Sequence, residues 1–166
     1  MVGAAPAAGR PSVPRSHHGR DTLTSTFARR LTGAVGQVAL GAMLLVAGIA
    51  HLTVARQEFL AQVPSWLPLD ADLVVVASGV VEICLGLALL AAWRQPVRGL
   101  TGAVVAAFFV AVFPGNIAQF TEGRDGFGLD TDAARAVRLL FQPLLVVWAL
   151  AATDGVSTLR SLRRRP

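Results

Sequence analysis

Apolar residues gather into four long blocks along the chain, and short polar links separate the blocks. Only two charged residues, Glu82 and Arg138, interrupt this apolar pattern. Each block is close to the roughly 20 residues that a helix needs to cross a bilayer. The pattern predicts an all-α protein, a four-transmembrane-helix bundle with spans over about residues 31–52, 73–93, 99–120 and 136–153.

The composition agrees with a membrane protein built as one domain. The chain has 166 residues, of which 54% are hydrophobic. We expect a four-helix membrane domain over residues 31–153. Residues 1–30 are rich in Pro, Gly, Ser and Arg and are predicted to form a disordered tail, and residues 154–166 are predicted to form a basic tail.

The charges are distributed as topology signals. Arginines outnumber acidic residues in both tails, and Arg94 and Arg98 lie in the short link after the second span. The links at 53–72 and 121–135 are acidic overall. The positive-inside rule therefore predicts that both termini face the cytoplasm. The net charge of +5 follows from this topology, so we expect the bilayer, and no nucleic acid, as the partner of the basic residues.

The first and third spans resemble each other. The pentapeptide LTGAV occurs at residues 31–35 and again at 100–104, and residues 49–53 resemble residues 117–121. Glu82 and Gln142 also occupy similar positions in the second and fourth spans. A parallel two-helix repeat would explain these matches. Helices rich in Ala, Val and Leu also resemble one another by composition alone, and the sequence leaves both explanations open.

Glu82 is the candidate with the greatest chemical interest. At 1.5 Å per residue it lies about 13–14 Å below the start of its span, near the middle of the bilayer. A carboxylate there costs roughly 3 kcal/mol or more unless it is paired, protonated or hydrated. Gly79 and Gly86 share its helix face and favour close packing against another helix.

Other polar residues are predicted to gather above Glu82 in the outer half of the bundle. They are His51, Asn116, Arg138 and Gln142. One interpretation is a pocket that binds a ligand and handles protons through Glu82 and His51. The other is structural: Arg138 pairs with Glu82 to fix the helix register, His51 and Asn116 cap helix ends, and amides bond the carbonyls that Pro114 and Pro143 release.

The sequence carries few signals for a cofactor. Cys84 is the single cysteine, so neither an internal disulfide nor a Cys-x-x-Cys pair can form. We find no metal cluster, haem-ligand pair or flavin fingerprint. A quinone is the cofactor or ligand that stays open, because the predicted pocket combines apolar walls with polar groups.

Five ordered motifs carry a family resemblance. They are GIAHL at 48–52, VPSWLP at 63–68, SGVVE at 78–82, FPGNI at 113–117 and RLLFQP at 138–143. In these motifs the chain resembles the DoxX-like family of bacterial four-helix membrane proteins, from about residue 41 to residue 153. The resemblance implies a bacterial cytoplasmic membrane and a link to thiosulfate:quinone oxidoreductase or redox-stress complexes. Distant relatives act as assembly chaperones for membrane receptors.

The sequence thus favours a non-catalytic accessory subunit of a redox or respiratory system. We expect it to bind quinone, lipid or a redox-protein partner through the outer-half pocket. The alternatives are a quinone-using membrane oxidoreductase, a small-solute carrier and a membrane-protein assembly chaperone. The sequence also leaves a homo-oligomer open.

Overall fold

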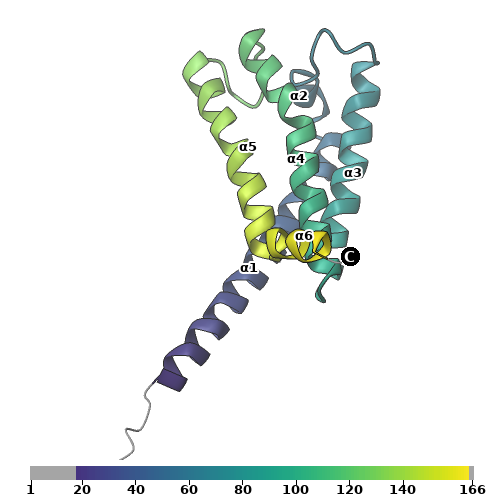
Figure 1. Ribbon diagram of the computed structural model, residues 1–166. Helices are drawn as coiled ribbons and strands as arrows, with labels where there is room; N and C mark the ends of the chain where they lie inside the picture. The colour runs from purple at the N-terminus through teal and green to yellow at the C-terminus, as the bar shows by residue number, and fades with distance from the viewer. Residues whose placement is uncertain (1–17, 165–166) are drawn as a thin grey trace, which may run out of the picture.

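A computed structural model describes the backbone of residues 18–164 and the side chains of residues 27–164. This part of the chain is entirely helical and contains no strand (Figure 1). The helices are α1 (His18–Leu52), α2 (Arg56–Leu60), α3 (Ala71–Ala91), α4 (Val97–Thr121), α5 (Asp132–Thr153) and α6 (Gly155–Arg163).

Four of these helices are long and apolar enough to cross a membrane. The candidate spans are Phe27–Leu52, Ala71–Ala91, Val97–Thr121 and Asp132–Thr153. The predicted four-helix membrane fold is therefore confirmed, and the chain is a multi-pass membrane protein. We call the end with α2 the outer end and the end with α6 the inner end, following the orientation predicted from charge (Figure 1).

Helices extend into both segments that the sequence assigned to tails. α1 begins at His18, so residues 18–30 are helical, whereas the sequence analysis predicted that they are disordered. The last proline before the span is Pro14, and a helix that the span already nucleates extends at little cost. At the other end, α6 runs across the inner end of the bundle, and Asp154 joins it to α5 with a φ of 58° (Figure 1). Residues 1–17 lie outside the described part.

The bundle consists of two closely packed helix pairs, α1 with α3 and α4 with α5. In the first pair glycines allow backbones to meet. A Cβ atom at Gly48 would lie 2.6 Å from the Gly79 carbonyl oxygen, and one at Gly86 would lie 2.8 Å from that of Gly41. Small residues play this role in membranes, where lipid is as apolar as a leucine side chain.

All four spans contribute to one apolar core in the middle and inner half of the bundle. Its fully or almost fully buried members are Leu40, Leu44, Leu89, Val105, Ala106, Phe109 and Ala149. Many other large apolar side chains are exposed on the surface of the bundle. Apolar side chains on the outer surface are expected of a protein that is surrounded by lipid and not by water.

Polar side chains fasten the inner ends of the helices. Gln37 is completely buried, and its Nε2 donates to the carbonyl oxygens of Leu89 at 2.6 Å and Ala92 at 2.8 Å. Arg98 Nε donates to Gln37 Oε1 at 2.6 Å, and its Nη2 donates to the Ala152 carbonyl oxygen at 2.6 Å. These bonds satisfy carbonyl groups at the ends of α3 and α5, which have no partner within their own helices.

Two outer loops cover the opposite end of the bundle and hold each other in place. Glu122 Oε1 accepts hydrogen bonds from Ser65 N at 3.3 Å and Ser65 Oγ at 3.0 Å. Arg124 Nη1 donates to the Val63 carbonyl oxygen at 2.7 Å, and Phe127 N donates to Glu58 Oε2 at 2.5 Å. The loops thus close over the space between the outer halves of the spans.

Candidate functional site

A cavity of about 440 Å³ lies beneath the outer loops. Its walls come from the four spans and from residues 59–67 of the first outer loop. All five residues that the sequence proposed for the site line this cavity: His51, Glu82, Asn116, Arg138 and Gln142. The structure therefore brings together residues that are up to 91 positions apart in the chain.

Glu82 is paired with His51. Its Oε2 lies 3.1 Å from His51 Nδ1, and the two side chains are about nine-tenths buried. The pair forms because α1 and α3 touch here: a Cβ atom at Gly79 would lie 2.6 Å from His51 Cβ. The glycine that precedes Glu82 by one helical turn thus brings the imidazole within reach of the carboxyl group.

The predicted ion pair between Glu82 and Arg138 does not form. The ion pairs among residues 27–164 include none between these two side chains. Arg138 instead donates from Nε to Asn116 Oδ1 at 3.3 Å, on the side of the cavity formed by α4 and α5. His51 is the nearer partner because it belongs to α1, which packs directly on α3.

His51 Nδ1 has two acceptors. It lies 2.9 Å from the Ala47 carbonyl oxygen, one turn back on α1, as well as 3.1 Å from Glu82 Oε2. One ring nitrogen carries at most one proton, so the carbonyl and the carboxyl group compete for it. Glu82 Oε2 is buried and has no well-oriented hydrogen bond to any described residue. The competition leaves this oxygen ready to bond a further group.

A chain of amide hydrogen bonds crosses the cavity wall between α4 and α5. Asn116 Nδ2 donates to Gln142 Oε1 at 2.9 Å, and Gln142 Nε2 donates to the Phe109 carbonyl oxygen at 2.6 Å. Pro114 lies in α4 within this stretch and cannot donate a backbone hydrogen bond. Pro114 releases the carbonyl of Val110, one turn earlier, whereas Gln142 bonds the neighbouring carbonyl of Phe109, so the predicted bond to the released carbonyl is not the one observed. Asn116 and Gln142 also line the cavity.

Two phenylalanines complete the site, and sequence reasoning did not select them. Phe59 of α2 stacks on His51 with the ring centres 3.3 Å apart, and Phe127 packs edge-on against Phe59 at 4.6 Å. The guanidinium carbon of Arg138 lies 5.0 Å from the centre of the Phe127 ring, within the range of a cation–π contact.

Phe127 takes its place through an unusual backbone. Its φ is 58°, a conformation that is strained for a side chain of this size. Strain of this kind costs about 1–3 kcal/mol and persists where surrounding contacts enforce it, often at functional sites. The two glycines beside Phe127 are the sequence signal for this turn.

Gln62 is a third residue that the sequence analysis missed. It lines the cavity, and its Nε2 is buried without a hydrogen-bond partner among the described residues. The cavity therefore contains one acceptor, Glu82 Oε2, and one donor, Gln62 Nε2, that this part of the chain leaves unbonded. Groups of this kind are usually satisfied by water or by a ligand.

A second cavity of about 360 Å³ adjoins the first. The two share Asn116, Phe127, Arg138, Gln142 and Leu145 as lining residues. The second cavity lies along α5, where Ala134, Val137 and Phe141 add to its walls. The amide chain therefore faces a cavity on each side.

A family model described as "Domain of unknown function (DUF8561)" matches residues 40–153. The chain belongs to this family. The DUF8561 region covers the outer half of the α1 span and all of α3, α4 and α5, so every residue of the site lies inside it. Comparison with curated proteins and with solved structures found no match.

The residues of the DUF8561 site do not form a metal centre. Among residues 27–164, no three His, Cys, Asp or Glu side chains gather where they could hold a metal ion. The arrangement instead offers hydrogen bonds, one imidazole–carboxyl pair and a guanidinium group within apolar and aromatic walls. It can offer hydrogen bonds to the polar head of an amphipathic molecule.

Proposed function

We propose that this DUF8561 protein binds a quinone in its outer cavity as a non-catalytic accessory protein of a redox or respiratory system. The observation that carries the proposal is the pairing of unbonded polar atoms with apolar walls in one cavity. Glu82 Oε2 is a free acceptor, and Gln62 Nε2 is a free donor among the described residues. A quinone carbonyl accepts a hydrogen bond, and a quinol hydroxyl donates one.

The size and lining of the cavity support a ligand of this class. Its volume of about 440 Å³ falls within the range of small-molecule sites. Met43, Leu44, Val74 and Leu145 supply apolar walls, which suit an isoprenoid tail. Phe127 and the ring pair beneath it supply flat surfaces for an aromatic or quinoid ring.

The resemblance to the DoxX-like family supports the redox setting. Four of its five motifs contain all five polar site residues, which are His51, Glu82, Asn116, Arg138 and Gln142. The bilayer itself supplies quinone to a membrane-embedded site. A redox protein that associates with the chain would then reduce or oxidise the bound molecule.

The test is to purify the protein in lipid nanodiscs that contain ubiquinone and menaquinone and to count retained quinone by extraction and native mass spectrometry. We expect about one molecule per chain and, with the pool reduced to quinol, a loss of about tenfold or more in Glu82→Gln, which exchanges one buried acceptor oxygen for an amide donor at nearly constant shape. Cys84→Ser is the matched control, because Cys84 is on the same helix and exposed.

Three outcomes would contradict the quinone assignment. Equal retention by Glu82→Gln and Cys84→Ser would remove Glu82 from the site. A lipid bound stoichiometrically in place of quinone would make the cavity a lipid site. An empty cavity in a protein that copurifies with another membrane protein would favour an assembly role.

The His51–Glu82 pair favours a second candidate, a quinone-using oxidoreductase. Reducing a quinone takes two electrons and two protons, and a carboxyl group that shares a proton with an imidazole can pass one on. The electrons would come from a reduced partner protein. Turnover of quinone by the purified protein with that partner, absent in Glu82→Gln, would establish catalysis, and retention without turnover would favour the accessory role.

A further inference from the structure

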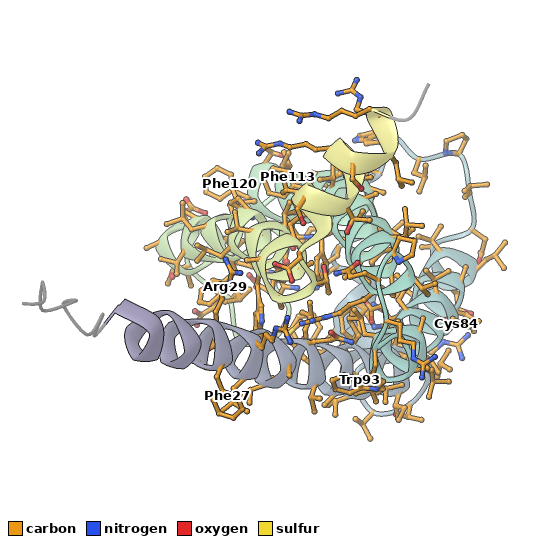
Figure 2. The ribbon with its side chains drawn as sticks, turned by 60° about the horizontal axis from the view of Figure 1, so that its bottom comes forward. Phe27, Arg29, Cys84, Trp93, Phe113 and Phe120 are labelled. Carbon is orange, nitrogen blue, oxygen red and sulfur yellow. The ribbon has the colours of Figure 1, made fainter. Side chains whose placement is uncertain are left out.

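A second polar site lies at the inner end of the bundle, far from the outer cavity. A cavity of about 470 Å³ opens there between α1 and α5. Its charged lining residues are Arg29, Arg30, Arg98 and Asp154. Figure 2 shows the Arg29 side chain on the side of α1 that faces α5, whereas Phe27 points to the opposite side.

Small residues of α1 make room for this cavity. A Cβ atom at Gly33 would lie 3.1 Å from Arg98 Nη2, and one at Gly36 would lie 3.2 Å from Trp148 Nε1. Trp148 Nε1 donates to the Gly36 carbonyl oxygen at 3.1 Å, which fixes the indole in the wall between the two helices. The floor of the cavity is therefore rigid.

Arg98 is held in place by the protein itself. Its Nε bonds Gln37 and its Nη2 bonds the Ala152 carbonyl oxygen, so the guanidinium cannot swing away from the cavity. Arg29 and Arg30 also line the cavity, and neither forms an ion pair with another residue among 27–164. Asp154 supplies one negative charge against three positive charges, and the cavity is left positive.

The cavity also lies near the predicted boundary between water and the bilayer. Arg29 and Arg30 stand just inside the start of the span at Phe27, where the helix passes from the aqueous phase into the bilayer. Leu144 lies one turn from Trp148 on the same face of α5 and is 62% exposed. A positive pocket at the interface thus continues into an apolar surface along the helix.

We infer that this inner cavity binds the phosphate group of an anionic phospholipid. Arg29 and Arg30 would bond the phosphate oxygens, Arg98 would contribute its fixed charge, and an acyl chain would lie along Leu144. Basic pockets between helices at the cytoplasmic face bind lipid headgroups through the same chemistry. A free phosphate ion shares the headgroup chemistry but cannot use the apolar surface.

The test is to count lipids that stay bound to the full chain by native mass spectrometry, after release from nanodiscs of phosphatidylglycerol and phosphatidylcholine. We expect one phosphatidylglycerol per chain to bind more tightly than phosphatidylcholine. The double variant Arg29→Gln/Arg30→Gln should weaken that preference about 25-fold, since each arginine near the membrane surface contributes about fivefold. These two exposed side chains make no contact that the fold requires.

The matched control is Arg160→Gln/Arg163→Gln, which removes the same charge from α6 at the same end of the bundle without touching the cavity. The control should keep the preference. An equal loss in both double variants would reduce the effect to general attraction of basic residues to the membrane, and equal binding of the two lipids would remove the site.

A separate measurement distinguishes the lipid from a free anion. Thermal unfolding in detergent is followed with inorganic phosphate or with short-chain phosphatidylglycerol added. Stabilisation by the lipid and not by millimolar phosphate is the expected result. Stabilisation by phosphate to the same degree would overturn the lipid assignment. Neither result depends on the outer cavity, so the quinone proposal can fail while this one holds.

Discussion

At the scale of single residues, the identity of the partner of Glu82 decides how the site works. The carboxyl group meets an imidazole at 3.1 Å and not a guanidinium. A guanidinium only donates hydrogen bonds, whereas each nitrogen of an imidazole can donate or accept one. The observed partner of Glu82 is therefore the His51 ring and not the Arg138 guanidinium that one interpretation of the sequence suggested.

Double-mutant cycles should reproduce this pairing. In unfolding experiments in detergent, His51→Gln and Glu82→Gln should be non-additive, with a coupling free energy of about 0.5–3 kcal/mol, because the two groups touch. Arg138→Gln and Glu82→Gln should add within about 0.5 kcal/mol. Coupling in the second cycle and additivity in the first would contradict the geometry.

Phe127 is a second single residue on which the site depends. Phe127→Gly should relieve the strain of a positive φ and at the same time remove the ring that contacts Phe59 and Arg138. We expect the protein to fold with little change in thermal stability but to lose affinity for its outer ligand. Phe120→Ala, on α4 outside the cavity lining, is the control and should leave ligand retention unchanged.

At the scale of helices, the contact between α1 and α3 is set by glycines. Gly48→Ala would place a Cβ 2.6 Å from the Gly79 carbonyl oxygen and 2.9 Å from Ile83 N, both backbone atoms that cannot move alone. Overpacking of this kind costs about 1–3 kcal/mol. We expect a clear fall in thermal stability and a wider spacing between His51 and Glu82.

Gly41→Ala is the variant with which the stability loss of Gly48→Ala is compared. Its nearest neighbours would be two Leu90 side-chain carbons at 3.0 Å, which can rotate away, and the Gly86 carbonyl oxygen at 3.2 Å, which is farther than the 2.6 Å contact at Gly48. The loss of stability should therefore be smaller than for Gly48→Ala. Equal losses would mean that the close backbone approach near Gly79 does not hold the pair together.

The outer loops should respond to acid. Burial opposes ionisation of Glu122, but hydrogen bonds from Ser65 and the nearby Arg124 guanidinium outweigh it and hold the pKa of this carboxyl group below its ordinary value. A lowered pKa means that Glu122 stabilises the loop contact at neutral pH and that this contribution is lost as the pH falls through the lowered pKa, below the ordinary range of a glutamate.

Hydrogen exchange can test this loop contact. Amides at residues 63–68 should lose protection on acidification, whereas Glu122→Gln should show weak protection already at neutral pH. Protection in the variant equal to that of the wild type would remove Glu122 from the contact.

The sequence predicted the helices well and their partners less well. Four apolar blocks of bilayer length define the spans, because hydropathy and helix length are properties of the sequence itself. Gly79 and Gly86 likewise indicated the packing face around Glu82. The sequence could not say which helix packs on that face, and this neighbour decides between His51 and Arg138.

The sequence did not predict the aromatic part of the site or the start of α1, because both depend on other parts of the chain. Phe59 and Phe127 belong to outer loops, whose path depends on contacts such as that between Phe127 N and Glu58, and no periodic pattern reports such contacts. The polar composition of residues 18–30 suggested disorder, but their attachment to a stable span makes them helical. The two-helix repeat and the homo-oligomer stay predictions.

At the scale of the whole molecule, the bundle is polar at both ends and apolar in its core. The outer end has a cavity with the His51–Glu82 pair, and the inner end has a cavity with three arginines. Between them the core of leucine, valine, alanine and phenylalanine leaves no charged residue among its members. The molecule thus presents two separate sites of different chemistry, one for each surface of the membrane.

The amide chain between α4 and α5 has a consequence for what the outer site can admit. Asn116 and Gln142, together with Phe127, Arg138 and Leu145, line both outer cavities, so side chains separate the spaces of about 440 and 360 Å³. A partition made of side chains can be opened by a change of rotamer, without moving either helix. Asn116→Ala should open part of this partition, and the protein should then accept bulkier molecules than the wild type does.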